Sequence, residues 1–284
     1  MGEVPKVALV TAKDYPGLTK DDRLLLPELE RLGLEGVPVV WDEPGVKWSL
    51  YSAAVLRSTW DYYRRPQEFL EWLPEAARQT RLWNPVRTVQ WNMRKTYLRD
   101  LGDRGLPVIP TVYLAGPSGL PSLLARQGWD RAVVKPSVSA GAHKTFLLSA
   151  QDTDRIASLV PELAGAGELM VQPYLDEVER GGERSLVFLE GRFSHAFLRA
   201  PKLGLSGQLR EGAPCDPTEK ELFIGQSAVS AAPDPPLYAR VDLVGDEAGT
   251  PRIMELELIE PALWLQNRPE AASQFARAIR ARIS

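Results

Sequence analysis

Three acidic residues near the end of the chain have the spacing that a metal site requires. Glu255 and Glu257 lie in the run Met-Glu-Leu-Glu-Leu, and Asp242 lies in the earlier run Ala-Arg-Val-Asp-Leu-Val. Alternate residues of a strand share one face, so the two glutamates should point the same way, and Asp242 joins them if the runs pair as a hairpin. Carboxylate oxygens suit a hard divalent ion such as magnesium. A solvated polar face over an apolar core fits the same alternation, so the pattern alone leaves both interpretations open.

A lysine followed by a loop of small residues indicates phosphate binding. Lys135 ends the apolar run Ala-Val-Val-Lys, and the loop from 137 to 144 that follows includes Ser139 and Gly141. The backbone N–H groups of such a loop can approach phosphate oxygens closely, and the lysine adds a positive charge. The spacing of a Walker-type P-loop is absent. An ordinary hairpin loop after an edge strand is the alternative interpretation.

Two other segments fit either a ligand site or plain structure. Residues 170–174 form an apolar run that ends at a proline, typical of a strand end or of a linker that lines a flat aromatic ligand. Trp60, Asp61 and Tyr62 follow an apolar strand at its carboxyl end, where open parallel sheets bind ligands. They fit equally well a turn before the helix that opens at Pro66.

The elements that position these residues fall into three parts. Residues 1–88 alternate predicted strands (7–10, 37–41 and 53–56) with predicted helices, which favours a parallel sheet covered by helices. Residues 89–171 begin with a helix at about 89–104 and continue as a small α+β unit. Residues 172–284 contain antiparallel strands at 183–189, 192–199, 238–244 and 252–258, a loop at 201–218 and a C-terminal helix at 269–282.

Length, charge and composition narrow the function classes. The 284 residues suggest about two domains, or one domain with two lobes. A formal net charge of -3 provides no domain-wide positive field for nucleic acid. The single cysteine, Cys215, cannot form an internal disulfide, and no stretch reaches the roughly 20 apolar residues that cross a bilayer. We therefore expect a cytoplasmic protein without nucleic-acid or membrane partners.

The two histidines offer little chemistry. Together with the lone thiol they nearly exclude a structural zinc site. His143 lies in a polar loop, where a solvated histidine is commoner than a catalytic one. His195 falls in an apolar strand run and is expected to be structural.

Taken in order along the chain, these pieces resemble the ATP-grasp superfamily, and specifically its glutathione-synthetase-like branch. Asn-Pro at 84–85 with Trp-Asn-Met-Arg-Lys at 91–95 resembles the helix that carries the first nucleotide-binding lysine, here Lys95. Val-Lys-Pro at 134–136 resembles the strand that carries the second, here Lys135, followed by the glycine-containing loop that closes over the phosphates. The resemblance covers most of the chain.

Further motifs extend this resemblance to the rest of the nucleotide site. Gln-Pro-Tyr-Leu at 172–175 resembles the hinge where adenine lies, which implies contacts from Gln172, Tyr174 and Leu175. Gly-Glu-Arg-Ser at 182–185 resembles the segment whose acidic residue, here Glu183, holds the ribose hydroxyls. Arg-Val-Asp at 240–242 and Glu-Leu-Glu at 255–257 resemble the two strands that carry the magnesium ligands.

The fold that this resemblance implies is an ATP-grasp fold of the α/β and α+β classes. A parallel-sheet domain at 1–88 would precede it and bind substrate. A linking helix and central subdomain would span 89–171, and a C-terminal subdomain with the metal site would span 172–284. The two α+β subdomains would grip the nucleotide between them.

Within the superfamily, two segments resemble a subgroup that includes the cyclo-ligase closing the ring in D-cycloserine synthesis. They are Arg-Ser-Thr-Trp-Asp-Tyr at 57–62 and Glu-Leu-Ile-Glu-Pro at 257–261. Two features depart from the wider pattern. Glu257 stands where glutathione synthetases usually carry Asn, and the loop from 202 to 212 matches only roughly the arginine-bearing loop near the transferring phosphate. Arg210 is the arginine available there.

The resemblance implies an ATP-dependent carboxylate–amine ligase that uses magnesium, or manganese in its place. A small-molecule carboxylate would attack ATP to give an acyl phosphate and ADP, and an amine would then displace phosphate. Glu260 or Asp61 would receive the proton of the amine. In a cyclo-ligase both reacting groups belong to one molecule. A homodimer is compatible with the resemblance.

Two rival functions remain open on the same fold. A phosphotransferase would let a hydroxyl attack, with no ligation to follow. A nucleotide-binding module without turnover would bind ATP and release no ADP, although both lysines and the three carboxylates are retained.

Overall fold

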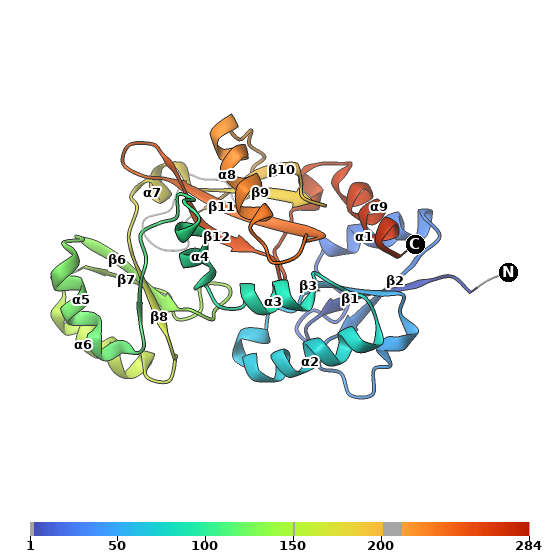
Figure 1. The fold of residues 1–284 in the computed structure, drawn as a ribbon, viewed down its shortest axis with the longest axis horizontal. Coiled ribbons are helices and arrows are strands. Elements are labelled where there is room, and N and C mark those ends of the chain that lie inside the picture. The colour runs from blue at the N-terminus through green and yellow to red at the C-terminus, as the bar shows by residue number, and fades with distance from the viewer. Residues whose placement is uncertain (1–2, 150, 201–211, 284) are drawn as a thin grey trace.

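The protein is described here by a computed structural model, which covers residues 3–149, 151–200 and 212–283. The strands in these described ranges form three sheets of four strands each. Figure 1 shows the N-terminal sheet at the lower right, the sheet of β5–β8 at the left, and the sheet of β9–β12 above and between them. Within the described residues, we find no helix that is both long and apolar enough to span a bilayer.

The N-terminal sheet is parallel, as the alternation of strands and helices predicted. Its strand order is β2-β1-β3-β4, and β1 pairs in parallel with both β2 and β3. The strands are β1 (Lys6–Thr11), β2 (Glu35–Val40), β3 (Ala53–Ser58) and β4 (Leu82–Trp83), and the helices are α1 (Leu25–Arg31) and α2 (Pro66–Gln79). Every residue of β3 is buried, which explains its uninterrupted apolar start. The carboxyl end of β3 leads directly into Trp60 and Tyr62.

The central sheet is antiparallel, in the order β5-β8-β6-β7. Its strands are β5 (Val112–Leu114), β6 (Arg131–Pro136), β7 (Phe146–Ser149) and β8 (Leu169–Pro173). Helices α5 (Leu120–Gln127) and α6 (Thr153–Leu163) pack leucines against one face, in a core that includes Leu123, Leu124 and Leu159. The opposite face is left to carry Lys135 at the end of β6.

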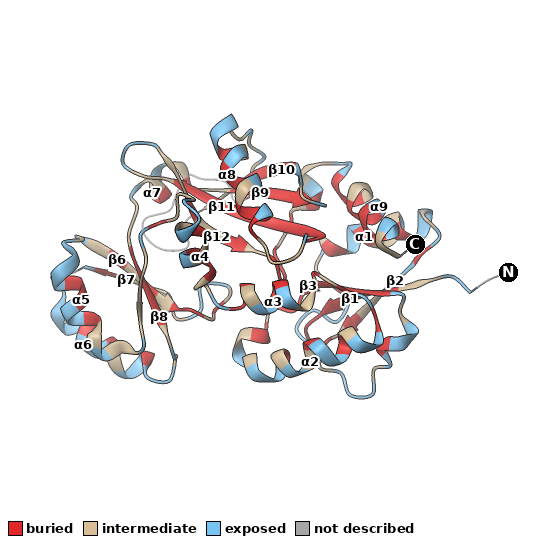
Figure 2. Cartoon of the chain, viewed as in Figure 1, coloured by how far each residue is buried: buried red, intermediate tan, exposed pale blue. Residues whose placement is uncertain are grey.

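The C-terminal sheet is also antiparallel, in the order β10-β9-β11-β12. Its strands are β9 (Glu183–Leu189), β10 (Arg192–Arg199), β11 (Tyr238–Gly245) and β12 (Pro251–Glu257), accompanied by α7 (Glu177–Gly181) and α8 (Glu219–Ser230). Figure 2 shows long buried stretches in the strands of this C-terminal sheet. Short 3-10 turns lie at Asp22–Leu24, Trp48–Leu50, Tyr62–Arg64, Pro117–Gly119 and Leu265–Asn267.

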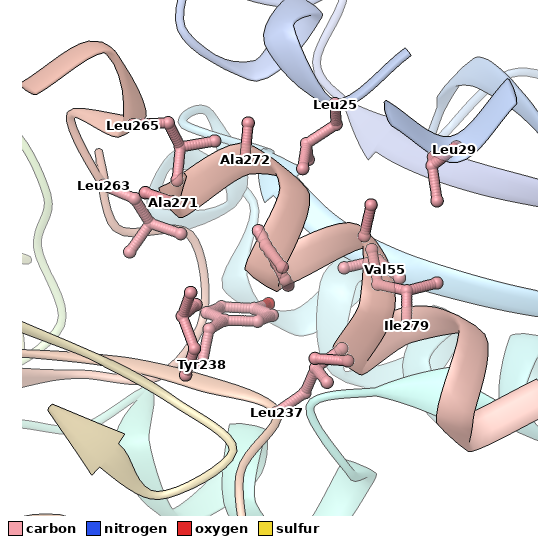
Figure 3. Packing of buried hydrophobic residues seen from close by; sticks show 14 of the residues in the cluster. Leu25, Leu29, Val55, Leu237, Tyr238, Leu263, Leu265, Ala271, Ala272 and Ile279 are labelled. Carbon is pink, nitrogen blue, oxygen red and sulfur yellow. The ribbon is translucent and has the colours of Figure 1, made fainter. Parts of the chain in front are cut away.

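The C-terminal helix α9 (Ala271–Ile283) joins the first and last thirds of the chain. It packs against α1, and the shared core holds Leu25 and Leu29 from α1, Ile279 from α9 and Tyr238 from β11 (Figure 3). The N-terminal sheet and the C-terminal sheet are therefore parts of one continuous core. The contact between α1 and α9 was not predicted, because the two helices lie at opposite ends of the sequence.

The predicted helix at 89–104 is wrong in one respect, because the structure divides it into α3 (Val86–Asn92) and α4 (Tyr97–Asp103). Helix-forming residues continue through the break, so propensity gave no sign of it. Tertiary contacts impose it: Asn92 donates to the carbonyl of Leu256 at 2.8 Å, and the N–H of Lys95 donates to the carbonyl of Ser137 at 2.8 Å. The break places the Lys95 side chain between the sheets.

Candidate active site

One cavity of about 480 Å³ lies between the central and C-terminal sheets and is closed at one end by the N-terminal unit. The structure gathers most of the site residues that the sequence predicted around this cavity: Lys95, Lys135, Ser139, Gly141, Gln172, Tyr174, Leu175, Glu183, Glu255, Glu257 and Glu260. Trp60, Tyr62, Tyr63 and Trp264 also line it. Its volume is that of an ordinary small-molecule site.

The carboxylates meet as the strand alternation predicted. Asp242 on β11 pairs in register with Glu255 on β12, and oxygens of Asp242, Glu255 and Glu257 all lie within 4.8 Å of one another. Such a concentration of negative charge requires cations nearby. Oxygen donors at this spacing fit a hard divalent ion, and the residues are therefore suited to hold one.

Two arginines, the buried Arg240 and the partly buried Arg199, neutralise part of this charge. Arg240 donates to both oxygens of Asp242 at 2.8 and 2.9 Å, and Arg199 donates to Asp242 Oδ2 at 3.0 Å. The Ser185 hydroxyl donates to Asp242 Oδ1 at 2.6 Å. Burial opposes ionisation, but the two guanidinium groups hold the pKa of Asp242 below its ordinary value. Neither arginine was predicted from the sequence to have a role, although the spacing Arg240-x-Asp242 puts both side chains on one strand face.

Glu257 shares the guanidinium of Arg240 with Asp242. Arg240 Nη2 lies 2.5 Å from Glu257 Oε1, because β11 pairs Arg240 in register with Glu257. This contact accounts for a carboxylate at the position where glutathione synthetases usually carry an amide, since the extra negative charge is met by the guanidinium. Each glutamate has a second carboxylate oxygen to offer a metal ion.

The two lysines differ in their partners. Lys95 Nζ forms a 2.5 Å ion pair with Glu255 Oε1, which holds the pKa of Lys95 above its usual value although burial opposes it. Burial, together with the charge of Lys95, lowers the pKa of Lys135. Among the described residues, Lys135 forms no ion pair. It is therefore a partly buried cation available to an anionic ligand.

Another part of the cavity lining is apolar. Leu175 and Met254 pack around a small core of Ile109, Val178 and Val244. Gln172 on β8 is held by a 2.9 Å hydrogen bond from its amide to Thr111 Oγ1. The guanidinium of Arg131 lies 4.4 Å from the centre of the Tyr174 ring and fixes it on one side.

Glu183 lies between this apolar end and the carboxylates. Arg199 Nη1 lies 3.3 Å from its Oε2. Burial outweighs this attraction and raises the pKa of Glu183 to about 7. A carboxyl group of this kind can either accept or donate a hydrogen bond near neutral pH, which suits contact with hydroxyl groups.

The segment after β12, residues 258–263, is held by side chains along its whole length, and we call it the clamped segment. Every main-chain carbonyl in it accepts a side-chain hydrogen bond of 2.7–3.0 Å. The donors, in order from residue 258, are Asn84, Tyr238, Trp60, Arg57, Arg240 and His195. They come from the N-terminal unit and from the C-terminal sheet, so both fix this backbone. His195 thus has the structural role expected of it.

Glu260 projects from the clamped segment into the cavity. It is 7% exposed, and no side chain in the described part of the protein forms an ion pair or hydrogen bond with its carboxylate. Burial and the nearby charge of Glu257 raise the pKa of Glu260 to about 8. The other carboxyl groups of the site each have a cation of the protein beside them.

The raised pKa predicts that Glu260 costs stability as the pH rises. The folded state keeps a proton that the unfolded state has already lost between pH 4.5 and about 8, so the free energy of unfolding falls through this window by up to ~1.4 kcal/mol per pH unit. Glu260→Gln is therefore expected to be more stable than the unaltered protein at about pH 8.5 and nearly equal to it at about pH 5. Urea unfolding at both pH values measures this. Greater stability of the unaltered protein at pH 8.5 would contradict the expectation.

Two predicted residues, Asp61 and Asp242, do not line the cavity, and a third, Arg210, falls outside the described residues. Asp61 does not line the cavity: one carboxylate oxygen accepts from Trp41 Nε1 at 2.9 Å and the other from Arg65 at 3.0 Å, which makes it part of the turn before α2. Asp242 is fully buried behind the cavity wall. His143, in the loop at 137–144, packs its ring 5.0 Å from that of Tyr63, which docks this loop on the N-terminal unit.

Comparison with known proteins agrees with this geometry. The family model for the N-terminal domain of D-cycloserine synthetase DcsG matches residues 7–84. The cycloserine biosynthesis protein DcsG of Streptomyces lavendulae is 32% identical to this chain, with 98% of each chain covered.

Solved structures extend the likeness to three dimensions. The crystal structure of D-cycloserine synthetase DcsG has a TM-score of 0.89 at 30% identity, covering 98% of this chain and 100% of that one. An ATP-grasp RimK domain protein from Sphaerobacter thermophilus has a TM-score of 0.75 at 18% identity, covering 96% and 99%, which supports the fold alone. The expected ATP-grasp fold is confirmed, and the chain belongs to the DcsG family of ATP-grasp proteins.

Proposed function

We propose that this enzyme, an ATP-dependent ligase of the carbon–nitrogen class, joins a carboxylate and a nitrogen of the same molecule through an acyl phosphate. The observation that carries this proposal is one cavity in which Lys95 and Lys135 face the carboxylates of Glu255 and Glu257. Phosphoryl transfer needs positioning and charge compensation more than covalent chemistry from the protein, and this cavity supplies both.

Each part of the nucleotide has a candidate site. The apolar end, with Gln172, Tyr174 and Leu175, would take the adenine, and Glu183 would accept from the ribose hydroxyls. Lys95, Lys135 and the loop residues Ser139 and Gly141 would face the phosphates. Arg210 keeps its proposed place near the transferring phosphate.

Asp242, Glu255 and Glu257 would hold magnesium, or manganese in its place. A metal ion bound there would neutralise charge on the transferring phosphate. Arg240 and Arg199 keep the Asp242 carboxylate ionised and oriented, and Lys95 does the same for Glu255. These cations of the protein prepare the donor set.

We infer the substrate class from the name of the relative D-cycloserine synthetase, which states its product. D-Cycloserine is a ring that contains a C–N bond between a carboxyl carbon and a nitrogen carried by the side-chain oxygen. Opening that bond gives a D-serine derivative with both reacting groups in one molecule. Its carboxylate would attack the γ-phosphate and release ADP. The nitrogen would then attack the acyl carbon, release phosphate and lose a proton.

Of the two carboxyl groups expected to receive that proton, only Glu260 lines the cavity. We therefore assign the substrate end of the cavity to Glu260, with Trp60, Tyr62 and Trp264 around it. The domain bounds at 1–88, 89–171 and 172–284 remain our proposal for the substrate, central and metal-bearing units. The lone Cys215 favours the cytoplasm, and sedimentation would decide between a monomer and a homodimer.

The test is to incubate the enzyme with ATP, magnesium and β-aminooxy-D-alanine, the open-chain form of D-cycloserine. We expect ADP and D-cycloserine in equal amounts, with the L-enantiomer as the control. Added hydroxylamine should trap an acyl phosphate as a hydroxamate. A stable phosphoester in place of the ring would favour the phosphotransferase, and nucleotide binding without ADP release would favour a non-catalytic module.

Lys135→Met is expected to weaken ATP binding by about 1–3 kcal/mol, because a charge-assisted contact is lost. The same change should leave the free energy of unfolding equal or higher, since it removes a partly buried cation that has no ion-pair partner among the described residues. Calorimetric titration and urea unfolding measure the two quantities. Unchanged affinity would remove Lys135 from the nucleotide site, and a clear loss of stability would show a structural role instead.

A further inference from the structure

The backbone at Glu260 is fixed by hydrogen bonds, but the carboxyl group has no counterion in the described part of the chain. Its backbone is fixed on both sides, because Trp60 Nε1 donates to the Glu260 carbonyl at 2.8 Å and Arg57 donates to the next carbonyl at 2.9 Å. The cations that act on it, Lys95 and Arg240, are held by Glu255 and by Asp242 and Glu257. A buried carboxyl group without a counterion lowers stability, whereas a fixed backbone at this position is what a ligand-binding residue requires.

Aromatic residues line the same cavity. Trp60, Tyr62 and Trp264 all border it, and the Tyr62 phenol is near enough for the charge of Glu260 to raise its pKa further above the level set by burial. Carboxylates combined with aromatic faces are the surroundings in which proteins bind ammonium groups. Glu257 adds a second negative charge close by.

We propose that Glu260, together with Trp60, Tyr62 and Trp264, forms a subsite for the free ammonium group of the substrate. This inference rests on the proposed function, in which the substrate is an amino acid derivative with two nitrogens. The nitrogen bound to oxygen is weakly basic and neutral at neutral pH, so it gains little from a buried carboxylate. The α-amino group is a full cation, and it supplies the counterion that Glu260 lacks.

The subsite makes the amino group a condition for binding. A ligand with the ammonium group would form a charge-assisted contact in a buried site, and a ligand without it would leave Glu260 desolvated and unpaired. Without an ammonium group Glu260 keeps its proton near neutral pH, because its pKa is raised to about 8, and it then offers the ligand no ionic contact. Compounds that lack the amine are therefore expected to bind more weakly.

The experiment compares D-cycloserine with isoxazolidin-3-one, the same ring without its amino group, by calorimetric titration in the presence of Mg-ADP. The unaltered protein should bind the amine-bearing ring roughly 10- to 100-fold more tightly. Glu260→Gln should reduce this ratio to about threefold or less, with thermal unfolding recorded to confirm the fold. Glu247→Gln, exposed at the tip of the β11–β12 hairpin and away from the cavity lining, should keep the ratio of the unaltered protein.

A second pair, D-serine and 3-hydroxypropanoate, separates the subsite from the proposed product. Preference for D-serine that disappears in Glu260→Gln, with no binding of either ring, would support the ammonium subsite and overturn the cycloserine-type product. Equal binding of the amine and its deaminated partner by the unaltered protein, in both pairs, would overturn the subsite. A preference that survives in Glu260→Gln would also overturn it, and would leave Glu260 the role of proton acceptor.

Discussion

Glu255→Gln is expected to lower turnover by roughly 100- to 1000-fold, the scale of losing one well-placed electrostatic group in an active site. Two effects combine. The metal donor set loses a charge, and Lys95 loses the carboxylate that its ammonium group contacts at 2.5 Å. Lys95 and Lys135 also hold the pKa of Glu255 below its ordinary value against the effect of burial, so the carboxylate is charged at every working pH. Release of ADP at saturating ATP, across a magnesium series, measures the loss.

Glu247→Gln is the matched control, because Glu247 is exposed at the tip of the same β11–β12 hairpin. It should retain the turnover of the unaltered enzyme. Glu255→Gln with full activity at limiting magnesium would remove this residue from the metal site. Activity that recovers only at high magnesium would agree with the assignment.

Arg240→Met is expected to destabilise the fold by about 3–5 kcal/mol, the usual result of removing one partner from a buried ion pair. Asp242 is completely buried and takes two of its hydrogen bonds from Arg240, and Glu257 takes a third. Without the guanidinium, the three carboxylates would face Arg199, Lys95 and Lys135 as the remaining cations among the described residues. Urea unfolding with and without magnesium measures the effect, and magnesium should restore more stability to the variant than to the unaltered protein.

Arg252→Met provides the comparison within the same hairpin. Arg252 also pairs with an aspartate, Asp246 at 2.9 Å, but its side chain is 35% exposed. Exposed pairs contribute about 0–1 kcal/mol, so this variant should lose little. Similar losses in the two variants would mean that Arg240 does not carry the charge balance of the site.

The sequence predicted most elements because their apolar runs match the burial that the fold requires. The stretch around Val55 is buried at every position, and the alternation of Glu255 and Glu257 with apolar residues reflects a strand with one face toward the core. The order of the motifs along the chain then predicted the ATP-grasp fold that links the sheets. Apolar runs are local features, and the motif order is a pattern shared with a known family, so both can be recognised in the sequence.

The rest depended on contacts between residues distant in sequence. The break between α3 and α4 arises from hydrogen bonds of Asn92 and Lys95 with other parts of the chain. Asp61 was a reasonable candidate base by position, yet Trp41 and Arg65 hold both its oxygens. Arg199 on β10 reaches Asp242 on β11 across the intervening strand β9. No local pattern encodes such partners.

The hydrogen bonds of the clamped segment also affect the order in which parts of the protein fold. Its donors Asn84, Trp60 and Arg57 precede their acceptors by 174, 200 and 204 residues. At the usual rate of synthesis the first of these side chains leaves the ribosome about 10 to 40 seconds before the carbonyl it holds. Contacts of such high order form late and slow the folding of the whole domain. The substrate end of the cavity is therefore completed last, so refolding chains should recover buried core fluorescence before they recover the ability to bind ligand.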